Sequence, residues 1–229
     1  AVVSADELSA AATALAAAAE AGGAQLPATE RERADAVVAK VAQRTALVGD
    51  HTVVALAGAT GSGKSPLFNA LVGGDIAVTG VRRPATSTPT AAIWGTEQAG
   101  ELLNGLGVGA RHVVGDRGVD QGAVLGSLDG LVLLDLPDFD SRGVGNRAEA
   151  ERVLELVDLF VWVTDPQKYA DARLHDDHVA ALATHEAVTM VVLNQSDRLS
   201  AAEVDQCRTD LVRLMERDGV PGATVLATS

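Results

Sequence analysis

The spacing of apolar residues divides the chain into a helical beginning and a longer part in which short apolar strands alternate with helices. Two capping boxes stand before residue 50, at Ser4–Glu7 and at Thr29–Glu32. In such a box the Ser or Thr side chain and the Glu side chain each accept a hydrogen bond from the other residue's backbone N–H. Gly22 and Gly23 are placed to end the first helix. We therefore expect two helices that pack as an antiparallel hairpin.

From His51 onward, uninterrupted apolar runs of strand length alternate with segments of helical length. The predicted strands are Thr52–Ala57, Ala91–Trp94, Leu131–Asp135, Leu159–Thr164, Val188–Leu193 and Ala223–Ala227. The predicted helices are Lys64–Val72, Arg147–Val157, Asp171–Leu182 and Ala201–Arg217. Continuous apolar strands separated by helices form mostly parallel sheets that are covered on both faces. We therefore predict an α/β fold, with a helical arm at residues 1–50 and the α/β domain at residues 51–229.

Composition limits the classes of partner and the cellular setting. The formal net charge is −13, with 31 acidic against 18 basic residues, which argues against nucleic-acid binding through bulk charge. The single cysteine, Cys207, excludes an intramolecular disulfide and fits a reducing, cytoplasmic setting. No apolar run reaches the roughly 18 residues of a membrane span, so we expect membrane association only through segments outside this sequence. The abrupt end at Ser229 leads us to expect a piece of a longer protein.

A glycine-rich loop gives the strongest indication of chemistry. Residues Gly58–Ser65 form G-x-x-x-x-G-K-S, directly after a predicted strand and at the start of a predicted helix, which is the context of a phosphate-binding loop. Its backbone N–H groups and the helix N-terminus attract phosphate oxygens, Lys64 reaches the β- and γ-phosphates, and Ser65 offers a hydroxyl to Mg²⁺. The residues expected to contact the nucleotide are Thr60, Gly61, Ser62, Gly63, Lys64, Ser65 and Pro66. This loop makes the predicted fold a P-loop NTPase three-layer sandwich, and it leaves ATPases, kinases and GTPases open.

A second loop narrows the choice of nucleotide. Asn194-Gln195-Ser196-Asp197 follows a predicted strand. The Asp197 carboxylate can accept hydrogen bonds from guanine N1–H and from the exocyclic amine, which adenine cannot donate in that arrangement. Asn194 would brace the loop and the aliphatic part of Gln195 would cover the base. The sequence therefore predicts a guanine nucleotide.

An acidic residue ends another predicted strand. Asp135 closes Leu131–Asp135 and is placed to hold Mg²⁺ through water, as a Walker B acid does. Asp138 and Asp140 follow it, and for both a solvated acidic loop is as good an interpretation as a role in catalysis. The polar segment Val81–Thr90 fits a switch loop, in which one threonine contacts Mg²⁺ and the γ-phosphate.

The order of these motifs resembles the translation-factor-like class of P-loop GTPases over residues 52–229. The strings L-A-G-A-T-G-S-G-K-S and L-F-N-A-L-V-G are similar to those of bacterial Era-like and dynamin-like GTPases. The resemblance implies GTP and GDP as ligands and a last loop at Thr228 and Ser229 that contacts guanine. It also implies Thr86 as the switch threonine, since T-S-T-P is similar to a bacterial T-R-D-P string, with Thr88 and Thr90 as alternatives. In the dynamin-like group a helical hairpin pairs with helices after the GTPase domain, so we expect a homodimer or a helical partner for the arm.

Departures from these families at four positions bear on mechanism. Pro66 stands where Ser or Thr is usual, and proline has no N–H to give to the α-phosphate. Asp138 replaces the glycine of D-x-x-G, and Phe139 stands where Ras-like proteins carry the glutamine that orients water. The asparagine of potassium-activated GTPases is replaced by Gly61. We therefore expect weakened nucleotide affinity and slow hydrolysis.

The sequence thus predicts a Mg²⁺-dependent GTPase that acts as a nucleotide-controlled switch. Lys64, Thr86 and Asp135 form the predicted catalytic set, and Ser65, Thr86 and Asp135 form the predicted metal set. A nucleotide-regulated interaction protein with little or no hydrolysis is the alternative.

Overall fold

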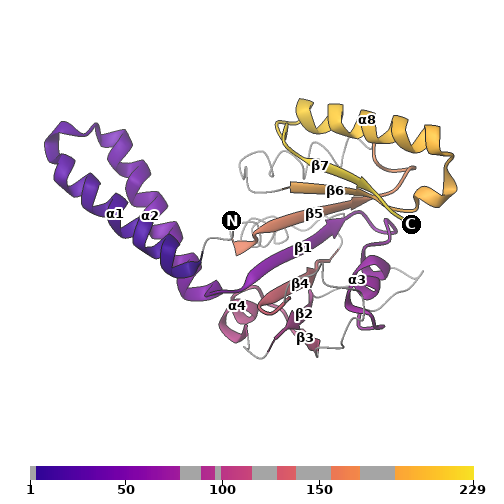
Figure 1. Cartoon of the computed structure of the whole chain (residues 1–229), viewed down its shortest axis with the longest axis horizontal. Helices are drawn as coiled ribbons and strands as arrows, with labels where there is room; N and C mark the ends of the chain where they lie inside the picture. The colour runs from indigo at the N-terminus through magenta and orange to yellow at the C-terminus, as the bar shows by residue number, and fades with distance from the viewer. Residues whose placement is uncertain (1–3, 78–88, 96–98, 115–127, 138–155, 171–188) are drawn as a thin grey trace. The chain divides into compact units, whose positions relative to one another are not determined.

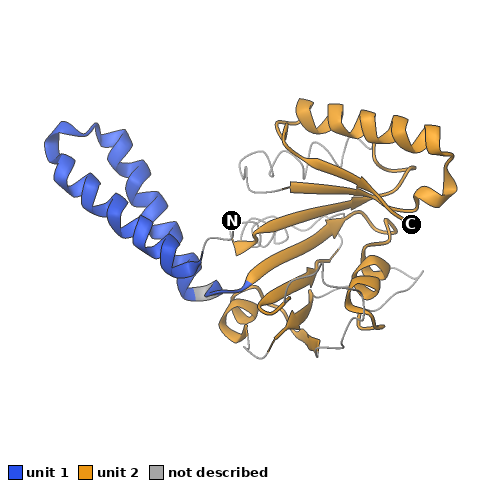
Figure 2. Cartoon of the chain, in the orientation of Figure 1, with its two compact units in different colours: residues 1–51 blue, residues 52–229 orange. Residues whose placement is uncertain are grey.

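The computed structural model describes residues 4–77, 89–95, 99–114, 128–137, 156–170 and 189–229 (Figure 1). The chain forms two compact units, Ala1–His51 and Thr52–Ser229 (Figure 2). Among the described residues, no helix combines the length and the hydrophobicity that crossing a membrane requires.

The first unit is a hairpin of two helices (Figure 1). Helix α1 spans Ala5–Gly22 and begins at the predicted capping box of Ser4 and Glu7, and a short 3₁₀ turn, η1, follows it at Gly23–Gln25. Helix α2 spans Ala28–Val48. The Arg31 guanidinium donates a hydrogen bond to the Gly23 carbonyl, which links α2 to the turn after α1.

The second predicted capping box is wrong. Pro27, in an extended conformation, is the N-cap of α2, so Thr29 already lies within the first turn of the helix. The N–H groups of Glu30 and Arg31 both donate to the Pro27 carbonyl at 3.1 Å. The proline fixes the backbone just before the helix, and the helix therefore begins one residue before Thr29.

The second unit is built on a seven-stranded sheet in the order β3-β2-β4-β1-β5-β6-β7. All neighbouring strands are parallel except β2 and β4, which confirms the predicted mostly parallel α/β sheet. The strands are β1 Thr52–Gly58, β2 Thr90–Trp94, β3 Ala110–Val114, β4 Leu131–Asp135, β5 Leu159–Thr164, β6 Thr189–Leu193 and β7 Thr224–Ala227.

Strand β3 and a short helix, α4, are absent from the sequence prediction. Strand β3 lies at the edge of the sheet, and its Arg111 and His112 side chains are exposed, so it has no continuous apolar run. Helix α4 spans only Gly100–Gly105 and has a glycine at each end. Neither element has the pattern by which the other strands and helices were predicted.

The helices that flank the candidate site agree with the sequence. Helices α3, Lys64–Val72, and α8, Ala201–Arg217, have the predicted bounds, and a 3₁₀ turn, η3, lies at Ser196–Arg198. The predicted helix Asp171–Leu182 lies outside the described residues, as does Arg147–Val157 except for its last two residues.

One buried cluster of the second unit lies between the sheet and helix α3. Phe68 and Val72 of α3 pack in this cluster with strand residues that include Leu56, Leu133 and Val163. This packing fixes the first turn of α3 beside the carboxyl ends of β1, β4, β5 and β6. Because those strands are parallel, the loops that follow them meet at one edge of the sheet.

Candidate functional site

The phosphate loop, Gly58–Ser65, joins β1 to α3 and is shaped by close backbone approaches at two glycines. A Cβ at Gly58, whose φ is +153°, would lie 2.1 Å from the carbonyl oxygen of Val163 on β5. A Cβ at Gly63, whose φ is +90°, would lie 2.2 Å from Asn194 Nδ2. At Gly58 the close atom belongs to the backbone and cannot move aside, and at Gly63 the positive φ disfavours any side chain, so the loop requires both glycines.

Three consecutive carbonyl groups of the phosphate loop accept hydrogen bonds from side chains far along the sequence. Lys168 Nζ donates to the Thr60 oxygen at 2.5 Å, and Gln195 Nε2 donates to the Gly61 oxygen at 3.2 Å. Asn194 Nδ2 donates to the Ser62 oxygen at 3.0 Å. In a trans peptide the C=O and the following N–H point in opposite directions. These three donors therefore turn the N–H groups of residues 61–63 away from the side chains that hold the loop.

Within the loop, the Ser62 N–H donates to the Ala59 carbonyl at 3.1 Å. Lys168 and Asn194, through the Thr60 and Ser62 carbonyls, therefore set the direction of the Gly61 and Gly63 N–H groups. Successive N–H groups beside a helix N-terminus attract anions.

A lysine, a serine and an aspartate meet beneath the phosphate loop. Ser65 Oγ donates to Asp135 Oδ2 at 2.7 Å, and Lys64 Nζ lies 3.9 Å from Asp135 Oδ1. The Lys64 side chain is 4% exposed and that of Asp135 is 0% exposed. The pairing of Leu56 with Asp135 places the carboxylate at the end of β4, next to the start of the loop. A hydroxyl and a carboxylate oxygen this close fit Mg²⁺, which prefers oxygen ligands.

The loop after β6 and the end of β7 are held together by backbone contacts. Gln195 adopts the left-handed conformation, with φ of 60°, and begins the 3₁₀ turn Ser196–Arg198. Ser196 N and Oγ both donate to the Thr228 oxygen, at 3.0 and 2.9 Å, and Thr228 N donates to the Leu193 oxygen at 2.9 Å. The residues predicted to contact guanine, Asn194 to Asp197 and Thr228 to Ser229, therefore lie together. Asp197 is exposed.

Pro66 lies in the first turn of α3, where a proline does not disturb the helix. The first hydrogen bond across this turn runs from Leu67 N to Gly63 O at 2.9 Å, so an N–H at residue 66 would have no partner within the helix. The Pro66 side chain is exposed. The helix therefore forms with proline at this position, but the helix N-terminus offers a ligand one fewer backbone N–H donor.

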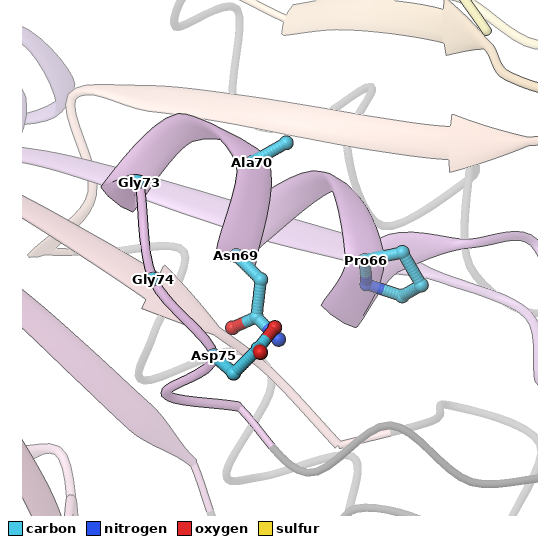
Figure 3. Close-up of a pocket in the computed structure, with 6 residues that line it drawn as sticks. All are labelled: Pro66, Asn69, Ala70, Gly73, Gly74 and Asp75. Atoms are coloured by element: carbon cyan, nitrogen blue, oxygen red, sulfur yellow. The ribbon is translucent and has the colours of Figure 1, made fainter.

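A cavity of about 470 Å³ lies beside α3 and the segment that follows it (Figure 3). It is lined by Pro66, Asn69, Ala70, Gly73, Gly74 and Asp75, so no residue of the phosphate loop forms its wall. The Asn69 side chain holds the segment after α3 through hydrogen bonds to Ile76 and to both backbone groups of Ala77. The cavity is therefore distinct from the phosphate loop.

Several predicted residues lie outside the described part of the chain. They are Thr86, Thr88, Asp138, Phe139 and Asp140. The other alternative for the switch threonine, Thr90, is the first residue of β2, buried and opposite Asp135 in the sheet register. Lys168 has no predicted role, although it is one of only three lysines in the chain, and this rarity is a signal for inspecting each of them.

A mostly parallel sheet with a phosphate loop between β1 and α3 defines a P-loop NTPase. The family model described as 50S ribosome-binding GTPase matches residues 53–195. The chain belongs to this family and is a GTPase domain. No curated protein sequence is similar enough to count as a relative.

Solved structures with the same fold include other P-loop GTPases. A bacterial dynamin aligns with a TM-score of 0.52 and 16% identity over 85% of this chain and 33% of the dynamin. Era from Aquifex aeolicus, bound to GDP·AlF₄⁻, aligns with a TM-score of 0.53 and 15% identity over 76% of this chain and 50% of Era. A chloroplast translocon component aligns with a TM-score of 0.52 and 16% identity over 83% of this chain and 77% of its own. The chain thus spans a third of the dynamin and half of Era.

Proposed function

We propose that this GTPase domain binds GTP and GDP with Mg²⁺, hydrolyses GTP slowly and acts as a conformational switch. The observation that carries the proposal is the set of hydrogen bonds from Asn194 and Gln195 to the phosphate loop. These contacts connect the loop that would read the base to the loop that would hold the phosphates. Both halves of one nucleotide site are then fixed relative to each other.

On the phosphate side, the Gly61 and Gly63 N–H groups and the Lys64 ammonium stabilise negative charge on the β- and γ-phosphates. Ser65 and Asp135 would hold Mg²⁺, Asp135 through water. Mg²⁺ supplies neutralisation of phosphate charge when it is bound. Thr86 or Thr88 completes the metal set, because Thr90 is already fixed in a strand and a switch residue must leave when the γ-phosphate is lost.

On the base side, Asp197 selects guanine. Asp197 is exposed, and its neighbour Ser196 is hydrogen-bonded to the Thr228 carbonyl. Thr228 and Ser229 would place backbone groups near guanine O6, and the Gln195 side chain would cover the base. Adenine would leave the carboxylate without its two donors.

Slow hydrolysis follows from the residues at the γ-phosphate end. Gly61 has no side chain and Phe139 cannot orient a water molecule, so the chain offers no water-positioning group at these two positions. We propose stimulation by a second copy of the chain or by a helical partner of the arm. Dimerization is important for the GTPase activity of the chloroplast translocon components. The similar bacterial dynamin pair senses and tethers membranes, and an equivalent membrane role for this domain would depend on further segments.

Calorimetric titration with GDP, a non-hydrolysable GTP analogue and ATP, each with Mg²⁺, tests the proposal. We expect binding of the guanine nucleotides and none of ATP. Asp197→Asn should shift the preference toward xanthosine nucleotides, because an amide can donate to the carbonyl that replaces the guanine amine. Asp205→Asn, the same change at an exposed position of α8, is the matched control. Equal affinity for ATP and GDP would contradict the proposal.

One observation favours a nucleotide-regulated interaction protein without useful hydrolysis. Pro66 removes a donor at the helix N-terminus, where a hydrolysing enzyme gains from tight phosphate contact. Turnover measured over a range of protein concentrations separates the two functions. Binding without turnover at every concentration would select the interaction protein.

A further inference from the structure

Lys168 belongs to a tight turn after β5. The buried Asp165 carboxylate accepts a hydrogen bond from Gln167 N at 2.9 Å, and the Asp165 carbonyl accepts from Lys168 N at 3.1 Å and Tyr169 N at 3.0 Å. The Tyr169 phenol lies near Cys207 of α8, and its pKa is raised, first by burial and then by Cys207. The turn is therefore held by the end of β5 and lies against α8.

From this turn Lys168 extends to the phosphate loop. Its Nζ lies 2.5 Å from the Thr60 oxygen and 3.7 Å from Asp165 Oδ2. A Cβ at Gly61 would be 3.2 Å from Nζ, so the ammonium occupies the space into which a side chain at residue 61 would extend. The carboxylate of Asp165 and the carbonyl of Thr60 thus fix the lysine between them.

We propose that Lys168 is a positioning residue for the nucleotide phosphates and orders the phosphate loop before the nucleotide binds. The inference rests on the proposed function. Holding the Thr60 carbonyl fixes its peptide plane, and the Gly61 N–H then points to the opposite side, toward an incoming phosphate. A loop that is ordered in advance loses less conformational freedom on binding, which raises affinity.

Burial and charge favour this role over a contribution to folding stability. The Lys168 side chain is 39% exposed, and ion pairs of exposed lysines add little to stability. The Thr60 oxygen, in contrast, receives a charge-assisted hydrogen bond, which is shorter and stronger than a neutral one. The loss of Lys168 is therefore expected to alter the loop more than the stability of the fold.

Three variants of the full chain test the inference. Lys168→Met removes the donor and keeps the length of the side chain, Lys168→Arg keeps charge and donors, and Lys40→Met removes a lysine from the exposed surface of α2. The first measurement is hydrogen exchange of the amides of residues 60–63 without nucleotide. The second is the affinity for fluorescent GDP and a non-hydrolysable GTP analogue, with the thermal unfolding midpoint recorded for each variant.

We expect Lys168→Met to speed exchange at Ser62, whose N–H is bonded to the Ala59 carbonyl within the loop, and to weaken both affinities by about tenfold at an unchanged unfolding midpoint. Lys168→Arg should recover most of the affinity, and Lys40→Met should behave as the unchanged chain. Wild-type exchange and affinity in Lys168→Met would overturn the inference while leaving the proposed function intact. If the unchanged chain binds no guanine nucleotide, the proposed function fails. The exchange measurement then still decides whether Lys168 orders the loop.

Discussion

At the scale of the residue, Pro66 is compatible with the fold but lacks a backbone N–H that a ligand would use. The first turn of α3 forms around it, since no bond within the helix uses an N–H at this position. A phosphate at the helix N-terminus would use that N–H. Pro66→Ser should therefore tighten GDP and GTP binding by roughly 1–2 kcal/mol, or about 5- to 30-fold. Calorimetric titration measures this change.

Pro66→Ala is the control for this prediction. It restores the N–H without adding a hydroxyl, so it should give a similar gain in affinity. If neither variant binds more tightly than the unchanged chain, the missing N–H does not limit affinity.

A second residue-scale prediction concerns stability. Gly58→Ala would place Cβ 2.1 Å from the Val163 carbonyl oxygen, a backbone atom that cannot turn aside, at a φ of +153°. We expect a loss of more than about 2 kcal/mol in the free energy of unfolding, measured by urea titration. Gly74→Ala has nothing within 4 Å of the added Cβ and should be close to neutral. Equal stability of the two variants would show that β1 and β5 can move apart at little cost in free energy.

At the scale of the element, helix α8 carries a capping box that depends on pH. The Ser200 hydroxyl and backbone N–H donate to Glu203 and lower the pKa of its carboxyl group. A carboxyl with a lowered pKa in the folded state stabilises the fold above its unfolded pKa, and this contribution is lost as the pH falls through the folded pKa. Glu203→Gln should therefore lower the thermal unfolding midpoint at pH 7, and the difference from the unchanged chain should shrink below about pH 4.

Glu216→Gln separates the effect of the cap from that of net charge. Glu216 lies in the same helix, outside the capping box, so its replacement changes the net charge equally without altering the cap. A pH-independent difference between Glu203→Gln and the unchanged chain would contradict the role assigned to the carboxylate.

The burial of each element explains whether the sequence predicted it. Strands with apolar residues on both faces, such as Leu131–Asp135, were predicted with the correct bounds because burial on two sides leaves an uninterrupted run. The edge strand β3 was missed because its Arg111 and His112 are exposed. The start of α2 was misplaced because Thr29-x-x-Glu32 matches a capping box while Pro27 begins the helix.

One part of the candidate site could be predicted from the sequence, and another part could not. Gly58–Ser65 and Asn194–Asp197 could be found from sequence because their chemistry requires particular residue types at fixed spacing. The contact of Lys168 with Thr60 joins residues that are far apart in the sequence, and it depends on the order of the strands, in which β5 lies next to β1. No local pattern contains that order, so this part of the site required the structure.

At the scale of the whole molecule, every described contact of the candidate site lies in the second unit, Thr52–Ser229. The donors to the phosphate loop come from the loops after β5 and β6, and the acid comes from β4. Strand β1 also begins within this unit, where Thr52 N donates to the Gly130 oxygen at 2.9 Å. Removal of residues 1–50 should therefore leave a folded domain whose affinity for GDP is within about twofold of that of the whole chain.

Titration of the two chains with GDP, together with their circular dichroism spectra, checks this prediction. The shorter chain should lose helical signal in proportion to α1 and α2 and keep its affinity. A folded shorter chain that binds GDP much more weakly would mean that the arm contributes to the site. If turnover rises with protein concentration in the longer chain and not in the shorter one, the arm stimulates hydrolysis. The arm would then have no part in phosphate contact or base selection, because both would be complete without it.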